Sequence, residues 1–137
     1  MFKTLTFFIL VAILSFAQGT SFQSVPVMTP QSFVVHINKD SEGITRQLTS
    51  TPNIWQFFYF CDNQKYKGKC GFWVDEKNNK IAGANNNVKR SGEEVTISES
   101  VVEDAGIYAK FPQNPDWNQA YLERLEVLVQ GPPRPPY

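Results

Sequence analysis

Apolar and polar residues alternate in several stretches of the chain with the two-residue period of a β-strand. Residues 33–37, 44–48 and 95–98 show this pattern, with apolar side chains at alternate positions. Turn-forming residues at 40–43 and a cluster of strand-breaking residues at 50–53 bound the second of these segments. We therefore predict three strands, each with one buried face.

Residues 54–61 form the most apolar stretch beyond the amino-terminal run, and aromatic side chains lie on both of its alternate faces. This composition predicts a central strand that is covered on both sides. Residues 71–74 would pair with it as a hairpin, and residues 82–87, with a glycine and three asparagines, predict a loop. In total, six or seven short strands separated by turns predict an all-β fold, an antiparallel β-sandwich.

The stretch 119–130 fits two patterns. Its last apolar residues alternate as in a strand, yet four apolar residues also recur at helical spacing: Tyr121, Leu122, Leu125 and Leu128. The valine-rich end and the surrounding β pattern favour a strand. Residues 131–137 are proline-rich and predict an extended tail.

Residues 1–19 have the order of a cleavable secretory signal, with one lysine near the start, a charge-free apolar run at 5–14, and small residues at Ala17 and Gly19. A membrane anchor needs about 20 apolar residues, roughly twice the length of this run. We therefore expect cleavage after Gly19 and secretion of the remainder.

Removing residues 1–19 from 137 leaves 118, a length that suits one domain. We divide this mature chain into an extended lead-in at 20–32, a domain at 33–130 and the tail at 131–137. The whole chain has 13 basic and 13 acidic residues. This balance does not predict a nucleic-acid partner, or a membrane partner after signal cleavage.

Cys61 and Cys70 are the two cysteines of the chain, and an oxidising compartment favours a disulfide between them. The bond would close a short polar hairpin loop that contains Gly68, and would stabilise the fold by about 2–3 kcal/mol. Two free thiols, or a bond between chains, are the alternatives. Because two cysteines and a distant histidine are too few ligands for zinc, we expect no metal site, and we expect no cofactor.

The most specific local signal lies at 95–108, where alternating apolar residues are followed by Asp104, Gly106 and Tyr108. This spacing resembles the E-to-F corner of immunoglobulin-like domains. There the tyrosine ring packs at the edge of the core and its hydroxyl returns to backbone a few residues upstream. The resemblance implies an immunoglobulin-like sandwich with a tyrosine corner at these residues. It also implies an extracellular module that recognises another protein through a sheet face or end loops.

Several positions depart from the family pattern. Lys110 stands two residues after the tyrosine, where the second core cysteine is usual, and no cysteine precedes Trp55. The usual disulfide between the sheets is therefore absent. Ser100 occupies a position where an apolar residue is expected. The resemblance places the core tryptophan near Trp55 and the closing strand at 120–130.

Few residues of the chain suit catalysis. A nucleophilic hydrolase needs a base beside its nucleophile, and the single histidine, His36, lies in a strand-like segment. Three acidic pairs that could serve a glycosidase lie beside turns: Asp75-Glu76, Glu93-Glu94 and Glu103-Asp104. We expect a binding protein and not an enzyme, with a small hydrolase as a third hypothesis.

The loop between the cysteines is a candidate partner-binding surface. Its three lysines and one tyrosine are Lys65, Tyr66, Lys67 and Lys69. A pinned loop loses less entropy on binding, and a solvated hairpin tip is the alternative reading. Acidic residues gather elsewhere, at Glu93, Glu94, Glu99, Glu103 and Asp104.

We expect the partner to be an extracellular or cell-surface protein. A second hypothesis is a glycan that binds exposed aromatic residues such as Trp117 and Tyr66.

Overall fold

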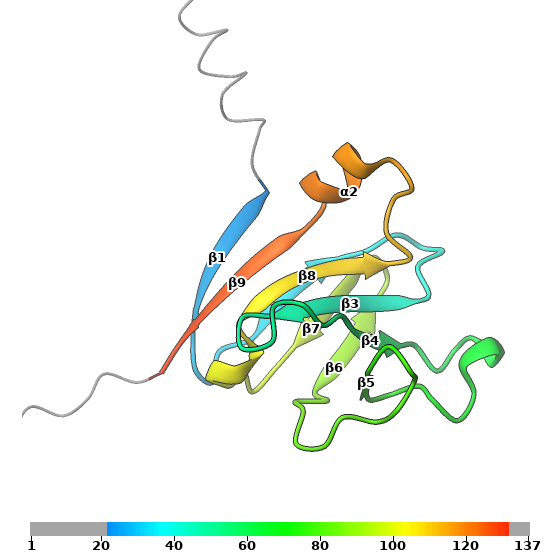
Figure 1. Ribbon diagram of the computed structural model, residues 1–137, viewed down its shortest axis with the longest axis horizontal. Helices are drawn as coiled ribbons and strands as arrows, with labels where there is room; N and C mark the ends of the chain where they lie inside the picture. The colour runs from blue at the N-terminus through cyan, green and yellow to red at the C-terminus, as the bar shows by residue number, and fades with distance from the viewer. Residues whose placement is uncertain (1–21, 132–137) are drawn as a thin grey trace, which may run out of the picture.

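The computed structural model describes residues 22–131, which form two β-sheets packed face to face (Figure 1). The elements in chain order are β1 (Gln23–Met28), β2 (Phe33–His36), β3 (Gly43–Leu48), β4 (Gln56–Tyr59), the 3₁₀ turn η1 (Gln64–Tyr66), β5 (Trp73–Val74), β6 (Val88–Ser91), β7 (Glu94–Ile97), the 3₁₀ turn η2 (Val102–Asp104), β8 (Gly106–Phe111), the helix α2 (Trp117–Leu122) and β9 (Leu125–Gln130). The predicted all-β sandwich is confirmed.

The larger sheet has the strand order β1-β9-β8-β3-β4-β5, and the smaller sheet has the order β2-β7-β6. Figure 1 shows β9, β8 and β3 side by side, with β7 and β6 behind them. The first strand, β1, forms one edge of the larger sheet beside the last strand, β9, and β5 forms the other edge. The pairing of β1 with β9 is parallel, and the other strand pairs are antiparallel.

Alternation along the strands creates the core between the sheets. Phe33 and Val35 of β2 are paired with Ile97 and Val95 of β7, and all four side chains are buried. Across the core, the ring of Phe33 meets the ring of Tyr108 edge to face, with centroids 5.1 Å apart. The alternating apolar residues of 33–37 and 95–98 therefore supply the wall of the smaller sheet, as predicted.

Gly106, a residue of the E-to-F motif, has a packing role. A Cβ atom at this position would collide with the backbone of Gln47 and Leu48 on β3. Glycine therefore allows β8 to begin in close contact with the end of β3.

The buried tryptophan of the core is Trp73, not Trp55. Trp73 lies on β5 with no exposed surface, and its ring meets that of Phe58 on β4 at 5.5 Å. Trp55 precedes β4 and is only half-buried. The expectation from the family resemblance is wrong here because β5 delivers its aromatic residue to the inner face, while Trp55 lies on the other face of β4.

Two further segments differ in detail from the sequence predictions. The ambiguous stretch 119–130 contains both alternatives in succession, with the end of α2 followed by β9. Residues 23–28 of the expected lead-in form β1, so the sheet begins before residue 33. The predicted signal peptide and residues 132–137 of the tail lie outside the described residues. Within residues 22–131, no helix has the length and apolar character needed to cross a membrane.

Candidate binding face

The inner face of the larger sheet holds a buried arginine. Arg46 lies on β3, is 2% exposed, and is the register partner of both Gln56 on β4 and Tyr108 on β8. Its Nε donates to Oε1 of Gln56 at 2.8 Å, and its Nη1 lies 3.2 Å from Oδ1 of Asp104. The guanidinium carbon is 3.9 Å from the ring centroid of Trp73. The charge is therefore compensated inside the protein.

Tyr108 completes this network. Its hydroxyl donates to the backbone carbonyl of Asp104, four residues upstream, at 2.6 Å, and accepts a hydrogen bond from Nη1 of Arg46 at 3.2 Å. Burial raises the pKa of Tyr108 to about 12. The second carboxylate oxygen of Asp104 accepts from Nδ2 of Asn85 and from the backbone N–H of Val101, both at 2.9 Å. Because these partners are internal, the network fixes the corner between β7 and β8.

Lys110 occupies the position where the family resemblance places a core cysteine. Alternation along β8 turns it to the same side as Tyr108, and its side chain is 14% exposed. Its Nζ reaches Oε2 of Glu123, beyond the end of α2, at 3.4 Å. The aliphatic stem of a lysine thus lies where a cysteine is usual, and its ammonium pairs with a carboxylate near the surface.

The outer face of the same sheet is also aromatic. Phe57 and Tyr59 alternate with buried Phe58 on β4, and both rings meet Phe111 of β8 edge to face, at centroid distances of 5.4 and 5.6 Å. Phe57 and Phe111 keep part of their surface exposed. Thr45, the register partner of Phe57, is small and almost fully buried beneath this cover. The outer face therefore presents partly exposed rings above a filled layer.

The loop between β4 and β5 folds onto one end of this face. The predicted Cys61–Cys70 disulfide is confirmed, with the two Cα atoms 5.1 Å apart. Tyr66 on η1 stacks in parallel on Tyr59 at 4.1 Å, and its hydroxyl donates to Oε1 of Glu42 at 3.1 Å. Tyr66 is only 5% exposed. The residue therefore anchors the loop, although the sequence placed it among the candidate partner contacts.

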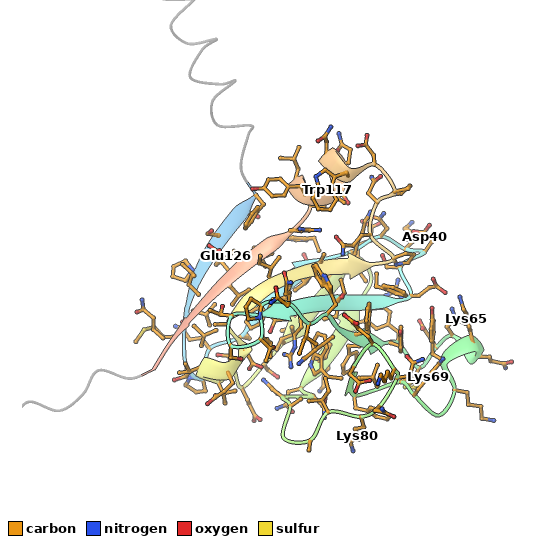
Figure 2. All side chains as sticks on the ribbon, in the orientation of Figure 1. Asp40, Lys65, Lys69, Lys80, Trp117 and Glu126 are labelled. Carbon is orange, nitrogen blue, oxygen red and sulfur yellow. A yellow bond between two sulfur atoms is a disulfide. The ribbon has the colours of Figure 1, made fainter. Side chains whose placement is uncertain are left out.

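A second arginine lies at the α2 end of the face. The guanidinium carbon of Arg124 is 5.4 Å from the ring centroid of Trp55 and 5.1 Å from that of Trp117. Asp116 begins α2 by accepting the backbone N–H of Asn118 at 3.0 Å, and Trp117 is 68% exposed at the first position of the helix. Figure 2 shows Trp117 on α2, projecting at the edge of the molecule.

The remaining sequence candidates are dispersed. Lys65 and Lys67 are exposed on the disulfide loop, Lys69 is half-buried, and His36 is exposed at the end of β2. The acidic residues do not form one patch. Glu93 and Glu94 lie at the start of β7, Glu99 precedes η2, Glu103 lies within η2, and Asp104 is buried. Sequence reasoning missed Arg46 and Arg124, although the position of Arg46 in the alternation of β3 was a usable signal.

The described part of the chain shows no further site that suits catalysis or metal binding. Among residues 22–131, no three histidine, cysteine or acidic residues gather as metal ligands would. A groove of about 870 Å³ runs between β1 and β2, with Val25, Phe33, His36 and Arg124 among its lining residues. It contains no cluster of groups that suits catalysis.

No protein-family model and no curated protein sequence matches the chain. A solved structure described as "Crystal structure of CD84: Insite into SLAM family function" is similar to it, at 13% sequence identity and a TM-score of 0.42. The alignment covers 82% of this chain and 100% of that one. At this level the likeness carries no argument about function.

Proposed function

We propose that the chain is a secreted, immunoglobulin-like interaction module that recognises another extracellular protein through the outer face of its larger sheet. The strand order and the hydrogen bond from Tyr108 to the Asp104 carbonyl support the immunoglobulin-like assignment and its tyrosine corner. The signal-like order of residues 1–19 supports secretion.

The observation that carries the proposal is the partly exposed set of large side chains on one rigid surface: Trp55, Phe57, Phe111, Trp117 and Arg124. Tryptophan and arginine are enriched among the residues that contribute most to protein–protein affinity. Ring-to-ring and guanidinium-to-ring contacts restrain these side chains before any partner arrives, so little side-chain entropy remains to be lost.

The core does not require this surface. The inner face of the same sheet is already filled by Phe58, Trp73 and Tyr108. The outer rings pack among themselves and with the disulfide loop, in a separate cluster. Trp117 in particular is 68% exposed and stabilises the fold little by burial, so its ring is accessible to a partner.

The test is a binding screen of the mature chain, residues 20–137, against a library of extracellular protein domains. Trp117→Ala should weaken binding to the captured partner about ten-fold or more. Val102→Ala, which trims an exposed apolar residue of the 3₁₀ turn η2, outside the larger sheet, is the control and should leave affinity within about two-fold. Equal affinity for the Trp117→Ala variant and the unmodified chain would contradict the proposal.

A glycan ligand is the second candidate, because an exposed indole such as that of Trp117 can stack on a sugar ring. Binding on a glycan array that is lost in Trp117→Ala, together with no captured protein, would favour it.

A further inference from the structure

Four lysines border the outer face where the disulfide loop and β5 lie. This lysine rim consists of Lys65, Lys67, Lys69 and Lys80. Figure 2 shows Lys65 and Lys69 around the disulfide loop and Lys80 near β5, while Glu126 lies on the opposite side of the molecule. The lysine rim therefore lies on one side of the face.

Aromatic rings hold three of these ammonium groups close to the face. Nζ of Lys69 lies 5.6 Å from the ring centroid of Tyr66 and 5.9 Å from that of Tyr59. Nζ of Lys65 is 5.4 Å from the Tyr66 ring, and Nζ of Lys80 is 5.2 Å from the ring of Phe72. These contacts fix positive charge beside the aromatic surface.

The carboxylates nearby are already engaged. Glu42 binds the Tyr66 hydroxyl and lies 3.5 Å from Nζ of Lys65, and Asp62 lies 3.5 Å from Nη1 of Arg90. Asp75 accepts two backbone N–H groups of its own turn, and the exposed Glu76 accepts the backbone N–H of Trp55 at 3.3 Å. Within the described part of the chain, Lys67, Lys69 and Lys80 have no carboxylate oxygen within 4.0 Å. These three ammonium groups therefore make no direct ion pair within the described part of the chain.

We propose that the partner of the outer face is a protein whose contacting surface carries Asp and Glu side chains opposite the lysine rim and apolar side chains opposite the rings. This inference rests on the proposed function. Charge complementarity at the border of an interface speeds encounter and selects among partners. A protein fits better than a sulfated polysaccharide because the rim encloses partly exposed aromatic rings, including Phe57 and Phe72, which apolar side chains can cover.

The experiment titrates the isotopically labelled mature chain with two short synthetic peptides, one repeating Glu-Glu-Phe and the other Lys-Lys-Phe, and with a heparin-derived oligosaccharide. We expect the acidic peptide to shift backbone amide resonances of residues 61–72 and 80, and the basic peptide to have no such effect. Lys67→Glu combined with Lys69→Glu should weaken binding of the acidic peptide at least about five-fold at low salt. Lys89→Glu, at an exposed position of β6 in the smaller sheet, is the matched control and should leave binding of the acidic peptide unchanged.

Three results would overturn the inference: no binding of the acidic peptide, shifts confined to another surface, or tighter binding of heparin than of the peptide. A protein captured in the library screen separates this inference from the proposed function. If Trp117→Ala weakens that complex while the double lysine variant binds it unchanged, the outer face is the interface and the acidic partner surface is wrong.

Discussion

Arg46 and Arg124 both lie against tryptophan rings, one inside the sandwich and one outside it. Arg46 is 2% exposed, bonds to Asp104, Gln56 and Tyr108, and lies over Trp73. Arg124 is half-exposed beside Trp117, and a weak hydrogen bond to Gln113 at 3.3 Å is its one side-chain hydrogen bond within residues 22–131.

The difference between the two sites is one of desolvation. A buried guanidinium loses its water and must recover that free energy from fixed internal partners, so removing any partner is costly. A half-exposed guanidinium keeps much of its hydration and remains able to bond to another molecule. Similar chemistry therefore serves folding on the inner face and is available for recognition on the outer face.

The largest expected effect comes from Arg46→Met, which leaves the Asp104 carboxylate buried without its positive partner. We expect the free energy of unfolding to fall by about 3–5 kcal/mol, as for other broken buried pairs. Chemical denaturation followed by far-ultraviolet circular dichroism measures it. Adding Asp104→Asn to Arg46→Met removes the orphaned charge and should recover part of the loss. If the free energy of unfolding of Arg46→Met lies within about 1 kcal/mol of that of the parent protein, the Arg46–Asp104 pair does not stabilise the fold.

Removing the disulfide should give the second-largest loss of stability. Cys61→Ser with Cys70→Ser should lower the free energy of unfolding by about 2–3 kcal/mol, because the loop gains freedom in the unfolded chain. The loop packs on the outer cluster, so the inner core should remain intact and the indole N–H resonance of buried Trp73 should not move. A shift of that resonance in the native state would show that the two faces are not independent.

The titration of Tyr108 should make the stability of the inner network depend on pH. Its pKa is raised to about 12, chiefly by burial, whereas the unfolded value is about 10. The stabilisation is therefore complete below pH 10 and is lost as the pH rises from about 10 to 12, with about 1 kcal/mol gone by pH 11.

Tyr108→Phe should cost about 1 kcal/mol at neutral pH, since it removes the hydrogen bond to the Asp104 carbonyl, and should flatten this alkaline loss. Unfolding curves of both proteins at a series of pH values test the two effects together. An unchanged stability at neutral pH would count against the tyrosine corner.

Local signals predicted the strands β2, β3, β4, β5 and β7 and the disulfide, because alternation and a short cysteine spacing need no knowledge of distant residues. They did not predict β1, which was expected to be a lead-in, or β6. The same alternation places Arg46 on the face of Ile44 and Leu48. Its partner Asp104, however, is 58 residues away in the sequence, and no local pattern predicts that ion pair. Charge alone would have placed this arginine in solvent.

The expectation of a core tryptophan near Trp55 was wrong for a related reason. Both tryptophans lie in aromatic stretches, and the face each one occupies depends on how β4 and β5 pair. The burial of Tyr66 could not be read from its polar loop, because it depends on stacking against Tyr59 of β4. The helix α2, at six residues, is too short for periodicity to detect, although Asp116 was a readable capping signal.

The smallest expected effect is the one that separates the two arginines most directly. Arg124→Met makes the same substitution as Arg46→Met, but at a half-exposed site that has no carboxylate partner among the described residues. The loss should be no more than about 0.5–1 kcal/mol, the value of an exposed cation–aromatic contact. The indole N–H resonances of Trp55 and Trp117 should nevertheless shift, because the guanidinium between them is gone. A destabilisation as large as that of Arg46→Met would make Arg124 a folding residue, and the outer face would lose the charged group best placed to meet a partner.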